Sequence, residues 1–226
     1  MSTWYFDPLP MFGFDVVDVD PPTHFQLYSE KGNRKSASAQ YDIMSWDDLA
    51  KMPVGHLVRG NGIITLWACP PTLEQSLWLL RQWGARFKTE LVWPKGRMTT
   101  GYRSRGMHES VLLGVFGDEH QIHDALYGVI KGKARGHSQK PREWYAHLRK
   151  KTPGLSRLCL FSRESHEGYT HWGNEVGLLD NDVKLARQQK EKVIAPTPLF
   201  DRLGEAAPTS GCIEPIEFAR ANELLL

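Results

Sequence analysis

Asp20, with Pro21 and Pro22 directly after it, is the place in this sequence where side chains are best arranged for chemistry. Proline has no amide N–H, and it restricts the residue before it to an extended backbone. This corner therefore offers a ligand only acceptors, the Asp20 carboxylate and the Pro21 carbonyl, which suit a donor-rich group such as the amino group of a nucleobase. Because Asp-Pro-Pro after a strand is in most proteins an ordinary turn, residues elsewhere in the chain must decide between these two interpretations.

The residues that precede Asp20 predict the strand that positions it. The run from Phe14 to Val19 is short and rich in β-branched residues, which is typical of a buried strand. Four further apolar runs predict strands over 62–69, 87–93, 110–116 and 157–161.

Helices are predicted between these strands. Ser45, with Asp48 three residues later, is an N-cap pattern that opens a short helix. Thr72 is predicted to cap a second helix that ends before Gly84, and Pro141 to begin a third helix over 141–151. The apolar faces are expected at Leu73, Leu77 and Leu80 on the second helix and at Trp144, Tyr145 and Leu148 on the third.

Strands that alternate with helices predict an α/β fold, in which a mostly parallel sheet is flanked by helices. Such sheets bind their ligands outside the carboxyl ends of the strands. Asp20, Cys69, Lys95 and Arg163 each come just after a predicted strand end. We therefore expect these four residues to share one site.

Length and charge limit how the chain is organised. Its 226 residues are enough for one large domain. We expect this domain over 1–179, followed by a tail with helical segments over 180–226, where the sequence becomes charged and then rich in Pro, Ala and Thr. The 28 Lys and Arg nearly balance the 26 Asp and Glu, but they cluster in 97–105 and 131–151. A phosphate backbone could bind such clusters, although most charged stretches are simply solvated.

The three cysteines, Cys69, Cys159 and Cys212, lie far apart and include no Cys-x-x-Cys pair for zinc. We expect reduced thiols in a cytoplasmic protein and no metal site. The first residues show no signal-peptide pattern, and no apolar run approaches the roughly 20 residues of a membrane span. Secretion and membrane insertion are therefore not expected.

Eight short motifs follow one another along residues 14–176: VDVDPP, YDIMSWDDL, ITLWAC, ELVWPK, MHESVLLGVFG, GHSQKPREWY, LCLFSR and HWGNE. In this order the chain resembles the METTL-type adenine-N6 methyltransferases, the family of the eukaryotic messenger-RNA adenosine methyltransferase and its bacterial and phage relatives. In this family the acidic Asp-Pro-Pro corner comes early and the segments that grip the methyl donor come late. The sequence has the same permuted order, which is more specific than any single motif.

The resemblance implies a Rossmann-like methyltransferase fold, S-adenosylmethionine as the cofactor, and a catalytic role for Asp20, Pro21 and Pro22. Lys140 would bind the carboxylate of the cofactor, and Asn174 and Glu175 its ribose hydroxyls. The other residues implied to bind the cofactor are Asp20, Arg163, Ser165 and His166. Those implied to bind the substrate are Thr23, Phe25, Tyr28, Lys35, Trp93, Lys95, Arg97, Arg103, Arg105, His108 and Glu109, of which Trp93 fits a place in the core equally well.

The implied reaction suits the corner at Asp20. The lone pair of an adenine amino group is delocalised into the ring, so the nitrogen is a poor nucleophile. Hydrogen bonds from its two N–H groups to the Asp20 carboxylate and the Pro21 carbonyl would draw the nitrogen toward tetrahedral geometry and free the lone pair to attack a methyl group. No base with a strongly shifted pKa is then required.

Thr23 departs from the family pattern, in which an aromatic residue, most often tryptophan, follows the two prolines and packs on the target base. Stacking on an aromatic ring is worth about 1–3 kcal/mol per base. Two functions stay open: an active methyltransferase in which Phe25 or Tyr28 replaces the missing ring, and a weak or silent relative that binds nucleic acid beside an active partner. A dinucleotide-dependent oxidoreductase is disfavoured, because no Gly-x-Gly-x-x-Gly turn follows the first strand.

Among nucleic acids we expect DNA rather than RNA as the substrate. The chain reads as one domain without added RNA-binding modules, which is similar to the bacterial and phage branch of the family. A base in a duplex must leave the stack for this chemistry, and the loops 26–41 and 96–106, with their Lys and Arg, are expected to hold the strand. A monomer and a homodimer fit the sequence equally well.

Overall fold

A six-stranded sheet organises the part of the chain that the computed structural model describes, which is residues 4–23, 43–96, 98, 105–117, 125–135 and 139–180. β1 (Phe14–Val19) is buried along its whole length, between β2 (Val58–Ala68) and β5 (Arg157–Leu160). The remaining strands are β3 (Arg86–Pro94), β4 (His108–Val115) and β6 (Thr170–Trp172), and the order across the sheet is β3-β4-β2-β1-β5-β6.

Five of these six strands point in one direction. β1 pairs in parallel with β2 and β5, and β5 pairs in parallel with β6. β4 is antiparallel to both β2 and β3, so it alone among the described strands is reversed. The amino end of β4 therefore lies at the edge where the other strands end. The predicted α/β fold with a mostly parallel sheet is confirmed.

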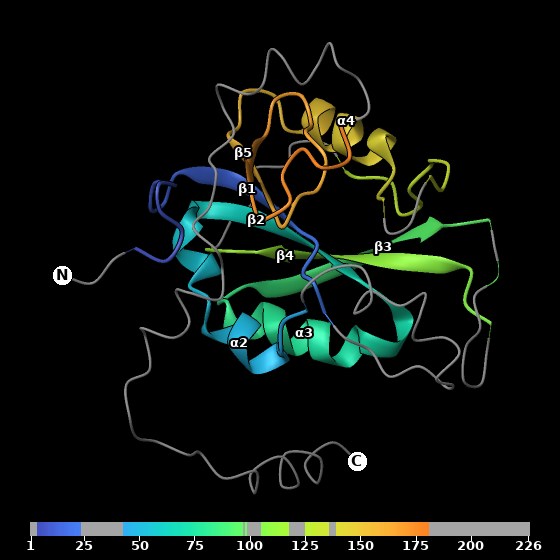
Figure 1. The fold of residues 1–226 in the computed structure, drawn as a ribbon, viewed down its shortest axis with the longest axis horizontal. Helices are drawn as coiled ribbons and strands as arrows, with labels where there is room; N and C mark the ends of the chain where they lie inside the picture. The colour runs from blue at the N-terminus through green and yellow to red at the C-terminus, as the bar shows by residue number, and fades with distance from the viewer. Residues whose placement is uncertain are drawn as a thin grey trace, which may run out of the picture. The chain divides into compact units, whose positions relative to one another are not determined.

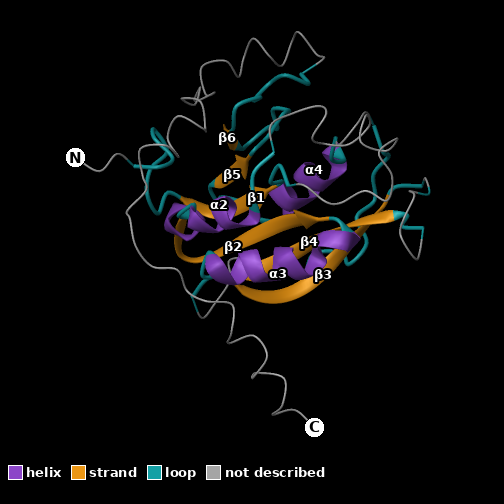
Figure 2. Cartoon of the chain, turned by 60° about the horizontal axis from the view of Figure 1, so that its bottom comes forward, coloured by secondary structure: helices purple, strands orange, loops and turns teal. Residues whose placement is uncertain are grey.

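Helices cover both faces of the sheet (Figure 1). α2 (Trp46–Lys51) and α3 (Leu73–Gln82) lie on one face, and α4 (Arg142–Lys151) lies on the other, as the turned view also shows (Figure 2). Two short 3-10 turns, η2 (Val54–Leu57) and η3 (Pro70–Thr72), lead into β2 and α3. None of the helices in the described ranges combines the length and the apolar character that crossing a bilayer requires.

The helix ends follow the sequence signals in part. The Ser45 hydroxyl accepts a hydrogen bond from the Asp48 backbone N–H at 3.1 Å, which confirms the predicted N-cap of α2. Gly84, with φ of +84°, follows the end of α3 as predicted. Thr72 is the N-cap residue of α3, but its side chain accepts no capping hydrogen bond; its hydroxyl donates to the Cys69 carbonyl at 3.1 Å. Pro141 is the N-cap residue of α4 rather than its first helical residue.

The two large helices differ in how well their buried faces were predicted. On α4, Trp144, Tyr145 and Leu148 are buried as predicted and belong to the core on that face of the sheet. On α3 the prediction is wrong at Leu73 and Leu77, which are only half-buried. The residues that α3 buries are Ser76, Leu79 and Leu80.

Segments outside the predicted elements also contribute. Residues 4–13 form turns, and Phe6 among them is fully buried and packs edge to face on Trp172 of β6, with 5.0 Å between the ring centroids. β6 was not predicted, because its three residues include no apolar run. The loop expected over 26–41 lies outside the described residues, and so does the tail expected over 180–226 except for Asp180.

Candidate active site

Strand alternation places four polar residues on the face of the sheet that α4 covers. Successive side chains of a strand point to opposite faces. Val16 of β1, Trp67 of β2, Trp93 of β3 and Val111 of β4 belong to the core under α4. On the same face, nearer the edge of the sheet, lie Asp20, Cys69, Lys95 and Glu109. Each is two or four residues away from the core residue of its own strand. Glu109 reaches this edge only because β4 runs in the reverse direction.

Ion pairs connect three of these residues through Lys140, which comes from the segment before α4. The Lys140 ammonium lies 2.9 Å from Asp20 Oδ1 and 3.1 Å from Glu109 Oε2. The other oxygen of Glu109 is hydrogen-bonded to the Lys95 ammonium. Asp20, Lys140, Glu109 and Lys95 therefore form a chain of alternating charge, which we call the ion-pair chain.

The ion-pair chain is only partly open to solvent. The side chains of Lys140 and Glu109 are 10% exposed, whereas that of Asp20 is 32% exposed. Asp20 is thus its most accessible member. No donor among the described residues reaches the second oxygen of Asp20, Oδ2.

Burial and charge shift the pKa values of these groups in opposite directions. Burial raises the pKa of Glu109, but the ammonium groups of Lys140 and Lys95 more than offset it and hold the pKa at about 2. Burial lowers the pKa of Lys140, and the carboxylates of Asp20 and Glu109 more than offset that, so the pKa lies above its usual range. Burial raises the pKa of Asp20, against the attraction of Lys140. Lys140 and Glu109 are therefore fixed as ions at neutral pH.

Three tryptophans form a layer under the ion-pair chain. Lys140 lies over the Trp67 ring at 5.1 Å, and Lys95 over the Trp93 ring at 5.4 Å. The Trp67 ring packs edge to face on those of Trp93 and Trp144. Trp93, for which the sequence left two interpretations, is 1% exposed and donates its ring N–H to the Gly132 carbonyl. It is therefore a core residue that supports Lys95 and does not present its ring to a substrate.

Asp18 is a buried carboxylate in the same layer, which the sequence reasoning missed. Its Oδ1 accepts hydrogen bonds from the Thr65 hydroxyl at 2.6 Å and from the Trp144 ring N–H at 2.9 Å. Burial raises the pKa of Asp18 to about 6, although these two hydrogen bonds lower it. A charged residue two positions before Asp20, on the inward face of an apolar strand, was the signal that could have revealed it.

A second set of ion pairs holds the backbone that carries Lys140. Glu164, in the loop after β5, is paired with Arg135 through both of its oxygens and with Arg142 of α4. Arg135 also donates to the Lys140 backbone carbonyl at 2.7 Å. This cluster ties the segment before α4 to the loop after β5, and so fixes the position of Lys140.

The corner at Asp20 differs from the prediction in one respect. The Asp20 N–H donates inward to the Leu160 carbonyl, so the corner presents no donor there. The Pro21 carbonyl, however, already accepts a hydrogen bond from the Thr23 N–H at 2.8 Å, which leaves it one lone pair for a ligand. Thr23 also forms a bridge with Met44, which holds the chain after the prolines in place.

The ends of β5 and β6 bring a second group of predicted residues together. The Arg163 guanidinium pairs with Glu175 at 2.7 Å. A side chain at Gly173 would lie 3.0 Å from the Phe161 Cα, so glycine permits the two strand ends to approach closely. Asn174, directly after this glycine, is exposed. Asn174 and Glu175 are consecutive residues at the carboxyl end of β6.

Comparison with known proteins assigns the chain to a family. The MT-A70 family model matches residues 14–175, which is most of the described part of the chain. The chain belongs to the MT-A70 family. The matched range begins at the first residue of β1 and ends at Glu175, so it contains the ion-pair chain and also Arg163, Asn174 and Glu175.

Relatives of this MT-A70 chain include proteins from bacteria, plants and animals. It is 26% identical to the type II methyltransferase M.MunI of Mycoplasma sp over 81% of this chain and 85% of that protein. It is 27% identical to a putative N(6)-adenosine-methyltransferase MT-A70-like protein of Medicago truncatula and 26% identical to the human N(6)-adenosine-methyltransferase catalytic subunit METTL3. The match covers 28% of the Medicago protein and 33% of the human protein, so this chain spans about a third of the length of either.

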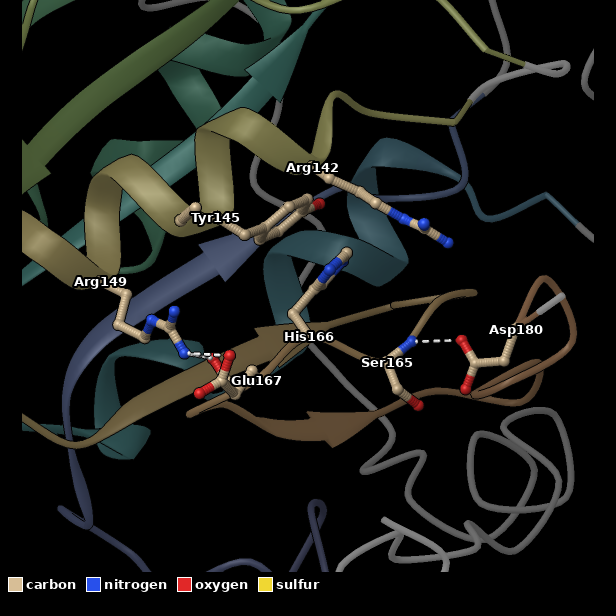
Figure 3. A pocket seen from close by; sticks show the side chains of 8 residues that line it. Arg142, Tyr145, Arg149, Ser165, His166, Glu167 and Asp180 are labelled. Atoms are coloured by element: carbon tan, nitrogen blue, oxygen red, sulfur yellow. Dashed lines mark hydrogen bonds and ion pairs between the residues drawn. The ribbon is translucent and has the colours of Figure 1, made fainter. Parts of the chain in front are cut away.

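Ser165 and His166 of the MT-A70 chain lie elsewhere, in a pocket between α4 and the loop after β5 (Figure 3). The His166 ring is buried and stacks on Tyr145 with 3.4 Å between centroids. The Ser165 N–H donates to Asp180. The pocket holds about 220 Å³, less than the 300 Å³ or more of a usual ligand site, and no member of the ion-pair chain lines it. The structure therefore does not bring Ser165 and His166 together with Asp20 and Lys140.

The remaining predicted residues lie at the surface or outside the described residues. Arg105 and His108 are exposed at the start of β4. In the described part of the chain, no group of three or more His, Cys, Asp or Glu is arranged to hold a metal ion. Phe25, Tyr28, Lys35, Arg97 and Arg103 lie outside the described residues.

Proposed function

We propose that this chain transfers a methyl group from S-adenosylmethionine to the N6 amino group of adenine in nucleic acid, with DNA as its substrate. The observation that carries the proposal is the ion-pair chain, which ends at Asp20 beside a corner that presents no donor. The Medicago and human relatives are named as N(6)-adenosine-methyltransferases, the Medicago protein as a putative one.

Asp20 and Pro21 would act directly on the adenine amino group. One N–H would donate to Asp20 Oδ2, which no described residue occupies, and the other to the remaining lone pair of the Pro21 carbonyl. These acceptors align with the nitrogen as it becomes tetrahedral, so they stabilise the transition state more than the planar ground state.

Lys140 would keep the Asp20 carboxylate ionised and oriented while it accepts these hydrogen bonds. Its ammonium has three N–H donors, of which one faces Asp20 and one faces Glu109. The four charges of the ion-pair chain sum to zero, so the site holds Asp20 as an anion without a net charge at the sheet edge.

The residues present fit S-adenosylmethionine by their chemistry. The third Lys140 proton can bind its carboxylate, and the Asn174 amide with the Glu175 carboxylate can hold its ribose hydroxyls. The Gly173 turn supports this assignment, since it brings Asn174 and Glu175 to the edge where Asp20 lies. When bound, the cofactor supplies a methyl group on a positively charged sulfur. Arg163 would then fix the Glu175 carboxylate.

DNA is proposed because the relatives include the type II methyltransferase M.MunI. A second function, a silent subunit that binds nucleic acid, is favoured by Thr23. This half-buried residue, which pairs with Met44, stands where the family has an aromatic ring.

Transfer of labelled methyl from S-adenosylmethionine to matched DNA and RNA oligonucleotides tests the proposal. We expect label in DNA with the wild type, and at least a hundredfold less with Asp20→Asn, because the amide replaces an acceptor oxygen with a donor. Asp47→Asn, an exposed substitution on α2, is the control and should keep full activity. Label on RNA alone would reject DNA as the substrate, and cofactor binding without label on any oligonucleotide would favour the silent subunit.

A further inference from the structure

Tyr127 presents an exposed aromatic ring next to a basic helix face that the proposed reaction does not use. The residue is 66% exposed, the most exposed aromatic side chain among the described residues. Its ring stacks on the His147 ring of α4 with 4.9 Å between centroids and an interplanar angle of 20°. The Lys151 ammonium lies 5.6 Å from the same ring.

The backbone around Tyr127 is held rigidly against β3. Val92 and Val129 form a parallel bridge, in which Val92 donates to the Gly128 carbonyl at 2.9 Å and accepts from the Ile130 N–H at 2.8 Å. Ile130 is buried in the core. The ring is thus pre-positioned, so binding a ligand would cost little ordering of this segment.

The same segment leads to the candidate active site. Because the bridge is parallel and β3 points to the carboxyl edge of the sheet, residues 127–133 run toward that edge. The Gly132 carbonyl accepts from the ring N–H of Trp93, which lies under Lys95 of the ion-pair chain. A ligand that extends from Asp20 along this segment would reach Tyr127.

The charge of this region is strongly positive. Residues 125–135 and 139–151 contain eight Lys and Arg and one acidic residue, Glu143. Four of the eight pair with carboxylates of other segments: Arg135, Lys140, Arg142 and Arg149. Lys131, Lys133 and Lys150 are exposed at the surface.

We infer that Tyr127, with the exposed Lys131 and Lys133 further along the same segment and Lys150 of α4, is a binding surface for the single-stranded nucleic acid that flanks the target adenine. An exposed, supported aromatic ring stacks on an unpaired base, and lysines along the path of the strand neutralise backbone phosphates. This aromatic–lysine surface rests on the function proposed above for the identity of its ligand, but binding to it is measurable without methyl transfer.

Fluorescence anisotropy with a labelled 20-nucleotide single strand tests this inference. Tyr127→Ala should weaken binding about five- to a hundredfold, the loss of one stacked base, whereas Tyr127→Phe should bind as the wild type does. Lys131→Ala with Lys150→Ala should reduce the slope of log affinity against log salt by about 1.4, since each phosphate contact to a single strand contributes about 0.7. The matched control is Lys51→Ala with Arg81→Ala, which removes two exposed charges from the opposite helix layer and should leave the slope unchanged.

An affinity of Tyr127→Ala within twofold of the wild type, together with an unchanged salt slope in the lysine variant, would overturn the inference. Losses of equal size in the control variant would overturn it as well. The outcome is separable from that of the proposed function. If methyl transfer occurs and the surface variants bind normally, the surface is refuted and the function stands. If no methyl is transferred but Tyr127→Ala weakens binding, the surface is supported and the reaction is refuted.

Discussion

Replacing the buried Asp18 by asparagine should stabilise the protein at neutral pH. Asp18 is fully buried, and its Oδ1 accepts from Thr65 and Trp144. Asparagine keeps this oxygen and almost the same volume, but it carries no charge. The substitution therefore removes the cost of burying an anion and leaves the Thr65 and Trp144 hydrogen bonds in place. The amide N–H2 group replaces Oδ2, which accepts from the Cys159 thiol at 3.8 Å, so that weak hydrogen bond is lost.

The size of the effect follows from the pKa of Asp18, which burial raises from 3.8 to about 6. The folded protein then binds the Asp18 proton more tightly than the unfolded chain does. The contribution of Asp18 to stability is fully present below pH 3.8 and is lost as the pH rises through about 6. The total loss is about 3 kcal/mol, of which about 2 kcal/mol falls between pH 4.5 and pH 8. Asparagine does not titrate, so the Asp18→Asn variant loses no stability at this position as the pH rises.

Urea unfolding followed by tryptophan fluorescence measures this difference. We expect the stability of Asp18→Asn minus that of the wild type to grow by about 2 kcal/mol from pH 4.5 to pH 8. Other titrating groups are common to both proteins and cancel in the difference. Asp18→Ala is the contrasting variant, because it leaves the Thr65 and Trp144 donors unpaired and should be less stable than Asp18→Asn at every pH. A stability difference between Asp18→Asn and wild type that stays constant with pH would refute the reasoning.

Three further predictions concern neighbouring features. Lys140→Met should lower the free energy of unfolding at pH 7 by about 3 kcal/mol in urea titrations, because it removes the cation that pairs with Asp20 and one of the two cations that pair with the buried Glu109; an unchanged midpoint would contradict this. Cys69, whose pKa is raised to about 11 first by burial and then by Glu109, should react with iodoacetamide at pH 8 about a hundredfold more slowly than a free cysteine, as followed by peptide mass spectrometry; a rate equal to that of free cysteine would count against it. Ser45→Ala should cost about 1 kcal/mol of stability through loss of the α2 N-cap, and Ser45→Thr, which keeps the hydroxyl that accepts from the Asp48 N–H and donates to the Asp48 carboxylate, should restore it.

Local features of the fold were predictable because they depend on neighbours in the sequence. The β-branched run before Asp20, the serine that caps α2 and the glycine that follows α3 each act within a few residues, and the structure confirms them. β6 escaped prediction because three residues are too few to show a period. The buried face of α3 was misjudged because adjacent helix faces carry similar leucines, and only packing selects between them.

The sequence by itself determined which residues stand at strand ends: Asp20, Cys69 and Lys95 lie at or just after the ends of predicted strands, and they follow β1, β2 and β3 directly. It did not determine their connections. The pairing of Glu109 with Lys140 depends on β4 running against the other strands, a matter of sheet topology. The buried state of Asp18 and the place of Trp93 under Lys95 depend on α4 covering the same face. Charge pairing and burial arise between segments far apart in the chain, so only the tertiary structure decided them.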